Sequence, residues 1–322
     1  MEQNISPNLG MDLVRVTEAS ALAAGRYMGL NKPDEADHYA AQDMAEAFRF
    51  INIEGHVVIG EETKLGVHSP LDSGTVVGSG YGPVMDVVVD PVDGTRLLSM
   101  GHPDAIAVVG IAPRGSMWSP YPAVYMEKIV VDSQAAEVLV PECMDAPAAW
   151  TLALIARAKK KNIRDLVVFI LDRPRHRDLI EEIRSAGARV MARSQGDIAG
   201  ALMAVTKEVN IDVMMGIGGI SEGVIAACAI KCFGGAMLGR LAPQTEDEII
   251  AIQEASLDTK RILTCDELVR GCDVFFAATG ITDGKLLSGV RYHGEWAETE
   301  SMVVRCQTGT RRIIHAEHRL TD

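Results

Sequence analysis

Residues 86–95 of the chain are Asp86-Val-Val-Val-Asp90-Pro91-Val-Asp93-Gly94-Thr95. The run of valines is typical of a strand buried inside a sheet. Because proline has no N–H to donate to a ladder, the strand should end at Asp90. Both carboxylates would then lie at the carboxyl end of a strand, where open sheets bind ligands. They could hold a hard divalent cation such as Mg²⁺, but a surface turn capped by Asp93 fits equally well, and the spacing does not decide between the two.

The composition limits the class of protein. The chain has 322 residues, enough for two domains or one large one. Its 31 basic and 44 acidic residues give a net charge of −13. This argues against nucleic acid or an anionic membrane as a partner, because both need a basic surface. An anionic substrate would need metal ions or a local basic cluster to reverse the field.

Two further features indicate a cytoplasmic protein. The six cysteines form no CxxC pair, which suits a reducing compartment. The first ten residues are polar and have no apolar signal segment. The most apolar run, residues 213–230, contains several glycines and Glu222, so we interpret it as a strand, a turn and a helix and expect no membrane span.

The spacing of apolar residues predicts an α/β protein with two domains that meet near residue 163. Residues 1–163 would form a metal-binding domain. Residues 164–322 alternate between strands and helices, which implies a mainly parallel, doubly wound sheet, and they contain a basic cluster that could form a phosphate site. We expect helices over residues 11–28, 34–51, 146–161, 174–186, 197–207, 221–232 and 245–259. We expect strands over residues 56–60, 87–90, 105–111, 124–131, 166–171, 189–192, 213–217 and 274–278, with further β-structure after residue 292.

Five carboxylates share one setting, because each lies at a helix start or where a strand or glycine turn ends: Asp37, Glu61, Asp90, Asp93 and Glu222. Without partners, converging carboxylates would repel one another. With two or three divalent cations they would become oxygen ligands of a site that stabilises charge in phosphoryl transfer and activates a water. The alternative is that they are separate caps and surface charges, because convergence does not follow from sequence.

A basic cluster, Asp172-Arg173-Pro174-Arg175-His176-Arg177, follows the expected strand over residues 166–171. Proline suits the first turn of a helix. Cations at a strand exit and helix start make a phosphate site through backbone amides and guanidinium groups. A solvated turn whose arginines pair with Glu181 or Glu182 is the alternative. The glycine-rich residues 216–223 allow a ligand to approach the backbone, but they do not match the dinucleotide-binding spacing.

The motif of residues 90–95, with Glu61-Glu62 upstream, resembles the metal-binding signature of the lithium-sensitive, metal-dependent phosphatases, which include the inositol monophosphatases. More of the chain resembles the class II fructose-1,6-bisphosphatases of bacteria, the glycerol-regulon type. The matching segments follow in order along nearly the whole chain: residues 14–19, 58–61, 90–95, 125–128, 173–176, 196–197, 216–223 and 277–282.

The resemblance implies an α+β layered sandwich with alternating helix and sheet layers. It implies hydrolysis of the 1-phosphate of fructose 1,6-bisphosphate, a step of gluconeogenesis, with Mn²⁺ or Mg²⁺. The implied metal ligands are Asp37, Glu61, Asp90, Asp93 and Glu222; Thr95 would orient the attacking water and Glu61 would help accept its proton. The implied substrate contacts are Gly94, Thr95, Tyr125, Arg173, Pro174, Arg175, Gln195, Gly196, Asp197 and Gly219. We expect a homo-oligomer, a dimer or a tetramer, whose partner is a small sugar bisphosphate.

The chain departs from the family pattern in several places. Asp93 stands where class II enzymes usually carry Glu, although the related monophosphatases use Asp there. The segment after Glu61 lacks the usual acidic, proline-containing residues, and Ala123 and Gln195 stand where aspartates are usual. These departures concern substrate preference more than reaction type. The alternatives are a broader phosphatase, acting on sedoheptulose 1,7-bisphosphate or an inositol phosphate, and a catalytically weak sugar-phosphate sensor.

Overall fold

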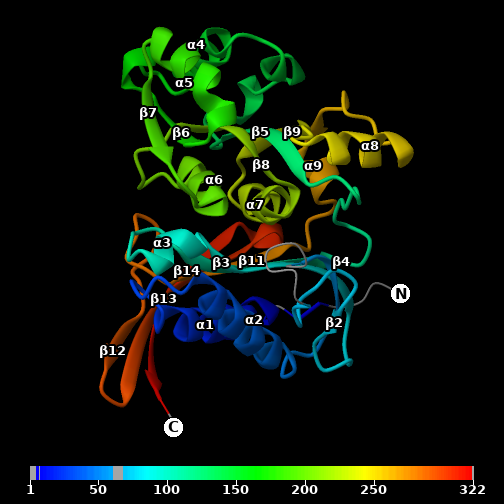
Figure 1. The fold of residues 1–322 in the computed structure, drawn as a ribbon, viewed down its shortest axis with the longest axis vertical. Coiled ribbons are helices and arrows are strands. Elements are labelled where there is room, and N and C mark those ends of the chain that lie inside the picture. The colour runs from blue at the N-terminus through cyan, green and yellow to red at the C-terminus, as the bar shows by residue number, and fades with distance from the viewer. Residues whose placement is uncertain (1–4, 7, 61–67, 321–322) are drawn as a thin grey trace. The chain divides into compact units, whose positions relative to one another are not determined.

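The computed structural model describes residues 5, 6, 8–60 and 68–320 (Figure 1). The chain divides into two compact units, one of Met1–Met117 with Gly271–Asp322 and the other of Trp118–Arg270. This division differs from the expected boundary near residue 163, which lies in a short 3₁₀ helix inside the second unit. The end of the chain returns to the first unit because β11 (Phe275–Gly280) pairs there with β4 (Ile106–Pro113) and β13 (Trp296–Arg305).

The first unit is built on a mixed sheet. In the described part of the chain its strands follow the order β12-β13-β11-β4-β3-β1-β2, with β14 paired to β13. β1 and β3 are parallel, and the other neighbours are antiparallel. The strands are β1 (Glu54–Ile59), β2 (Val76–Val77), β3 (Val84–Asp93), β4 (Ile106–Pro113), β11, β12 (Arg291–His293), β13 (Trp296–Arg305) and β14 (Thr310–Arg319). The helices are α1 (Leu9–Gly25), α2 (Pro33–Phe48), α3 (Thr95–Ser99) and the 3₁₀ helix η5 (Cys306–Thr308).

The apolar spacing that predicted the first two helices also explains how they pack. Leu13 and Val16 of α1 and Met44 of α2 are fully buried in one core with Val87 and Val109 of the sheet. Residues three or four apart lie on the same helix face, so this face is the one the sheet covers.

β3 continues through Pro91 to Asp93, so the expectation that it ends at Asp90 is wrong. Asp90 pairs with Val108 of β4 and Asp93 pairs with Ile106, so β3 has one residue more than β4 between the two pairs. This is a β-bulge, in which one residue is left out of the ladder. A bulge is a place where a sheet tolerates proline, because no hydrogen bond from its nitrogen is needed.

The second unit also contains a mixed sheet, in the order β10-β9-β5-β8-β6-β7. Its strands are β5 (Tyr125–Val131), β6 (Val167–Leu171), β7 (Arg189–Arg193), β8 (Val213–Gly219), β9 (Ala236–Leu241) and β10 (Leu263–Thr264). Its α-helices are α4 (Ala148–Ala158), α5 (Arg177–Ser185), α6 (Asp197–Val205), α7 (Ile220–Cys232), α8 (Glu246–Glu254) and α9 (Cys265–Leu268). Its 3₁₀ helices are η1 (Ala136–Val138), η2 (Pro141–Met144), η3 (Ile163–Asp165) and η4 (Pro174–His176).

The expected mainly parallel, doubly wound sheet is corrected by this strand order. β6, β7 and β8 are parallel, as the alternation of strands and helices predicts. β5, however, lies between β8 and β9 and is antiparallel to both. The helices α4 and α5 lie on one side of the sheet, and α6 and α7 lie on the other (Figure 1). Each unit therefore combines helices with a mixed sheet, which confirms the predicted layered α/β class.

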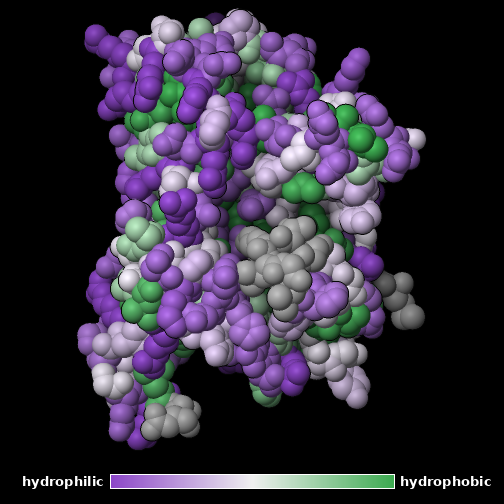
Figure 2. Space-filling view, viewed as in Figure 1, coloured by the Kyte–Doolittle hydropathy of each residue, from purple (hydrophilic) through white to green (hydrophobic). Residues whose placement is uncertain are grey.

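The surface visible in Figure 2 is mainly hydrophilic, as expected when most apolar residues are buried. The face drawn in Figure 2 is covered mainly by hydrophilic residues, with small groups of apolar side chains between them. Within the described residues, none of the helices has the length and apolar character needed to cross a membrane.

Replacing Gly200 of α6 with alanine should destabilise the second unit. An added Cβ would lie 2.2 Å from Cε1 of Phe169, a fully buried side chain of β6. Overpacking of a core costs about 1–3 kcal/mol, which outweighs the roughly 1 kcal/mol that alanine gains over glycine in a helix. We expect a lower midpoint of thermal unfolding, and partial recovery when Phe169→Leu is added. An unchanged midpoint in the single variant would show that this contact is not tight.

Candidate active site

The end of β3 presents two carboxylates on one face of the sheet of the first unit. Asp90 and Asp93 are each 4% exposed. In a regular strand, residues three apart point to opposite faces. Here they oppose Val108 and Ile106, which are two residues apart and thus share a face. Oδ1 of Asp90 accepts a hydrogen bond from the N–H of Val92 at 3.0 Å, which holds the bulge in shape.

Thr95 follows directly, because Gly94 turns the chain. Gly94 has φ +96°, a left-handed conformation that glycine adopts without steric cost. α3 then begins at Thr95, whose Oγ1 donates to Oδ1 of Asp37 at 2.7 Å. Asp37 is half-buried in α2, one turn after the helix begins at Pro33, whereas the acids of the first turn are Asp34 and Glu35. The structure thus brings together two predicted site residues that are 58 positions apart.

The donor chemistry of this group fits a hard divalent cation, because buried carboxylate and hydroxyl oxygens are the ligands that Mg²⁺ and Mn²⁺ take. The group does not complete a ligand set by itself. Among the residues that the structure describes, no three His, Cys, Asp or Glu side chains are grouped closely enough to hold a metal ion. Glu61, the fourth expected ligand, lies outside the described residues, and Glu222 belongs to the second unit.

In the second unit, His176 joins the ends of β6 and β8. Its ring lies 2.6 Å from the carbonyl oxygen of Leu171, through Nδ1, and accepts the N–H of Ile217 at Nε2, at 2.8 Å. Since the backbone N–H must donate, Nε2 is the acceptor and Nδ1 carries the proton. The side chain is buried, and burial lowers the pKa of the imidazole below 6.5. A neutral histidine therefore fixes the basic cluster to the sheet.

Arg175 is held at the surface by two contacts of its guanidinium. Nη2 donates to the carbonyl oxygen of Ile217 at 2.8 Å, and the guanidinium carbon lies 5.3 Å from the centre of the Tyr125 ring, a cation–π distance. Within the described residues, no ion pair joins the arginines of this cluster to Glu181 or Glu182, so the alternative of a paired, solvated turn is not observed. Arg173 is half-buried and immediately precedes η4, which Pro174 begins.

Gln195, Gly196 and Asp197 lie where the chain enters α6. Gly196 has φ +89°, and Asp197 is the first residue of the helix. Oδ2 of Asp197 accepts a hydrogen bond from Nζ of Lys128 at 2.7 Å, and both side chains are buried. Burial raises the pKa of Asp197, and the charge of Glu222 adds to this effect, while Lys128 opposes it.

Lys128 was not predicted as a site residue. It lies in β5 directly after Glu127, and no sequence signal separates a buried lysine there from one that faces solvent. The strand segment 125–128 was matched to the family as a block, and this was the one indication of its importance.

The glycines of β8 leave room for acidic side chains. A Cβ at Gly218 would lie 1.6 Å from Oδ2 of Asp197, and a Cβ at Gly219 would lie 1.9 Å from Oε2 of Glu222. Glu222 is in the first turn of α7, and its Oε2 accepts a hydrogen bond from Ser221 at 2.7 Å. Tyr125, Arg175, Asp197, Gly219 and Glu222 are thus gathered around the β5–β8 strand pair.

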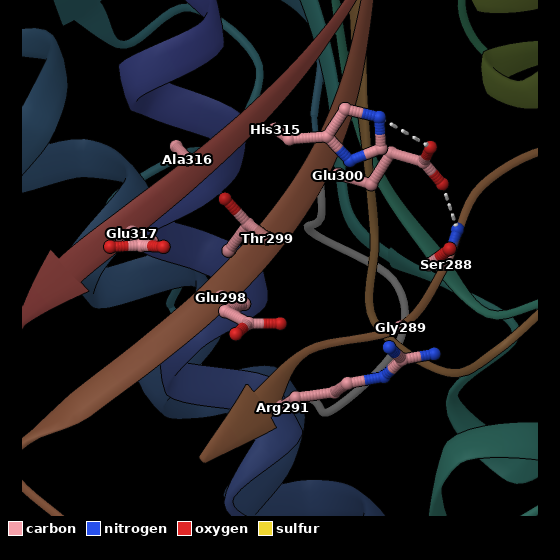
Figure 3. A pocket seen from close by; sticks show the side chains of 9 residues that line it. All are labelled: Ser288, Gly289, Arg291, Glu298, Thr299, Glu300, His315, Ala316 and Glu317. Atoms are coloured by element: carbon pink, nitrogen blue, oxygen red, sulfur yellow. Dashed lines mark hydrogen bonds and ion pairs between the residues drawn. The ribbon is translucent and has the colours of Figure 1, made fainter. Parts of the chain in front are cut away.

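A cavity of about 600 Å³ lies elsewhere, on β12, β13 and β14 of the first unit (Figure 3). Of its lining groups, Glu300 pairs with His315 at 3.3 Å and accepts the N–H of Ser288. None of the predicted site residues lines it.

Buried strand-end carboxylates beside a threonine hydroxyl are suited to binding a divalent cation, and arginines at a strand exit are suited to binding a phosphate. The chain matches, over residues 7–318, the family described as bacterial fructose-1,6-bisphosphatase, glpX-encoded. It is 36% identical to the class 2 fructose-1,6-bisphosphatase of Haemophilus influenzae, over 98% of this chain and 97% of that one. The chain therefore belongs to the class 2 fructose-1,6-bisphosphatase family, and the predicted resemblance is confirmed.

A further relative carries a double name. The chain is 35% identical to the D-fructose 1,6-bisphosphatase class 2/sedoheptulose 1,7-bisphosphatase of Synechococcus sp. strain JA-2-3B'a(2-13), over 96% of this chain and 95% of the relative. The corresponding protein of Synechococcus sp. strain JA-3-3Ab has the same identity, coverage and name. These matches extend over nearly the full length, so they include both units.

The neutral state of His176 should make stability depend on pH. Its pKa is lowered in the folded protein, so below about pH 6.5 the unfolded chain binds more protons than the folded one. Stability should then fall as pH decreases, by at most about 1.4 kcal/mol per pH unit for this group. Urea unfolding between pH 5.5 and 8 measures this effect: as pH falls, the free energy of unfolding should decrease less steeply for His176→Gln than for the wild-type protein. If the free energy of unfolding changes equally steeply with pH in the two proteins below pH 6.5, the assignment is contradicted. Above pH 7.5 the difference in free energy between the two proteins should be constant, and this is the internal control.

Proposed function

We propose that the protein is a cytoplasmic, metal-dependent phosphatase that converts fructose 1,6-bisphosphate to fructose 6-phosphate and phosphate, a reaction of gluconeogenesis. Its membership of the class 2 family supports this activity. The observation that carries the mechanism is the hydrogen bond from Thr95 to Asp37, next to the buried carboxylates at the end of β3. A binding module has no need of such a fixed hydroxyl, so this contact favours an enzyme over a sensor.

The proposed cofactor is Mn²⁺ or Mg²⁺, held by Asp37, Asp90 and Asp93 together with Glu61 and Glu222. When bound, such cations neutralise phosphoryl charge and lower the pKa of a bound water. This assignment rests on the oxygen donors of these side chains and on the family pattern.

Thr95 has a defined direction of hydrogen bonding. Oγ1 lies within hydrogen-bond distance of two acceptors, Oδ1 of Asp37 at 2.7 Å and the carbonyl oxygen of Val92 at 3.2 Å, so its proton is donated to them and its lone pairs are available to accept a hydrogen bond from a water. The hydroxyl would therefore orient the attacking water, and Glu61 would help accept the proton that the water loses. Direct attack by water requires no covalent enzyme intermediate.

The substrate contacts proposed for the second unit fall into two types. Arg173 and Arg175 would bind a phosphate, assisted by the backbone at Pro174, because guanidinium groups match its oxygens. Tyr125, whose ring already contacts Arg175, would lie against the sugar. Gln195, Gly196, Asp197 and Gly219 complete the contacts proposed for this unit, and Gly94 and Thr95 are those proposed for the first unit. The proposed assembly is a homo-oligomer, a dimer or a tetramer.

Hydrolysis of sedoheptulose 1,7-bisphosphate is a second proposed activity. Two full-length relatives carry both substrate names, and this supports it. Departures from the family pattern at Asp93 and Gln195 bear on the balance between the two sugars. Both substrates share the chemistry of a phosphomonoester on a polyhydroxy chain, so one mechanism serves both.

Thr95→Ala should reduce turnover much more than it weakens binding. Loss of a group that orients a reactant in the transition state typically costs about 100-fold in rate. We expect kcat to fall by about that factor while KM changes less than about threefold. Thr95→Ser, which keeps the hydroxyl, is the control and should retain most activity. A kcat of Thr95→Ala within about threefold of the wild-type value would rule out the orienting role.

Phosphate release should depend on a divalent cation. We expect release from fructose 1,6-bisphosphate and sedoheptulose 1,7-bisphosphate when Mn²⁺ or Mg²⁺ is present, loss of activity with a chelator, and recovery on adding excess metal. An inositol monophosphate in the same panel tests the broader phosphatase. If no substrate releases phosphate with any metal, the proposed function is wrong.

A further inference from the structure

Asp197 is one of the proposed substrate contacts, but its buried ion pair with Lys128 has no assigned role. Lys128 of β5 is fully buried, Asp197 is 6% exposed, and Nζ lies 2.7 Å from Oδ2. Removing two charges from water is costly, so such a pair gives little net stability compared with an apolar pair. Its presence in a core therefore calls for another explanation.

Asp197 uses one of its two carboxylate oxygens in this pair. The other, Oδ1, is buried and has no hydrogen-bond partner among the described residues. A buried acceptor without a donor is unfavourable and is rare in native structures. A donor from outside the chain would remove this deficit.

The position of the carboxylate is fixed from several sides. Gly218 of β8 has no side chain, and this leaves the space that the carboxylate of Asp197 occupies. A Cβ at Gly218 would lie 1.6 Å from Oδ2 of Asp197 and 2.7 Å from Nζ of Lys128. Gly196, in a left-handed conformation, sets where α6 begins and hence where Asp197 stands. Lys128 comes from β5, the neighbour of β8 in the sheet. Oδ2 is thus held by its ion pair, and Oδ1 is left in a fixed place.

We propose that Lys128 is a positioning residue, which holds Oδ2 of Asp197 so that Oδ1 accepts a hydrogen bond from a hydroxyl of the sugar. The inference rests on the proposed function, because it takes a sugar phosphate as the ligand. A carboxylate oxygen accepts from a hydroxyl but repels a phosphate. Asp197 would therefore recognise the polyhydroxy chain, while Arg173 and Arg175 recognise the phosphate.

Lys128→Met tests this division of roles. With the ammonium removed, Oδ2 is released and the acceptor is no longer fixed. We expect KM for fructose 1,6-bisphosphate to rise about tenfold, as for loss of one charge-assisted hydrogen bond, with kcat changing less than about threefold. In calorimetric titrations of the metal-loaded protein, the Kd of fructose 6-phosphate should rise by a similar factor, whereas that of inorganic phosphate should not change.

Lys159→Met is the matched control. Lys159 is also a nearly buried lysine of the second unit, and it pairs with Asp132 and Asp212 at 2.9 and 3.0 Å. Neither of these partners is a proposed substrate residue. We expect its replacement to lower thermal stability without changing KM or the Kd of either ligand.

Gly218→Ala is the second variant, and it decides the matter if Lys128→Met does not fold by circular dichroism. It keeps both charges but displaces the carboxylate of Asp197 from Lys128. It should therefore raise the Kd of fructose 6-phosphate and leave the Kd of inorganic phosphate unchanged. The inference is overturned if the folded variants bind fructose 6-phosphate with the wild-type Kd. It is also overturned if the Kd values of fructose 6-phosphate and inorganic phosphate rise equally. If the wild-type protein binds fructose 6-phosphate but hydrolyses no bisphosphate, the proposed function fails while the binding comparison still decides the role of Lys128.

Discussion

The bulge between Asp90 and Asp93 is the constraint on which the candidate site of the first unit depends. Without it, two acids three residues apart in a strand would point to opposite faces. The additional residue in β3 places them opposite Val108 and Ile106, which share a face. Pro91 is compatible with this geometry because a bulge requires one residue fewer in the ladder. The left-handed Gly94 then reverses the chain and starts α3 with Thr95 beside Asp37.

Sequence predicted the elements of this fold better than their connections. The helical spacing of Leu13 and Val16 is a local pattern that can be read from one sequence. Both helices at the start of the chain were therefore predicted. The insertion of β5 between β8 and β9 depends on pairing between distant segments. The order of strands and helices along the sequence does not tell whether two paired strands run parallel or antiparallel. For the same reason, the return of β11 to the first unit was missed, and the doubly wound sheet was predicted too broadly.

The site shows the same division between local and distant information. The basic cluster at Arg173 and Arg175 was evident because its parts are contiguous, and its attachment to the sheet by His176 uses the same segment. The contact between Thr95 and Asp37 was not, although both residues were named. Lys128 was missed altogether, because its burial is decided by Asp197 and Gly218, which lie in other elements.

An acidic chain can present cations to an anionic substrate because its buried acids are neutralised locally. In the second unit, the charge of Asp197 is matched by Lys128, whereas the buried Glu248 of α8 is stabilised by hydrogen bonds from the neutral N–H groups of Val124 and Tyr125, at 2.8 and 2.9 Å. Glu248 thereby also fixes the start of β5, on which Tyr125 contacts Arg175. Two opposite charges paired at this range largely cancel beyond their neighbours, so the Lys128–Asp197 pair adds little negative potential near Arg175. The same neutralisation that makes the core of this unit tolerable therefore leaves its arginines able to attract a phosphate.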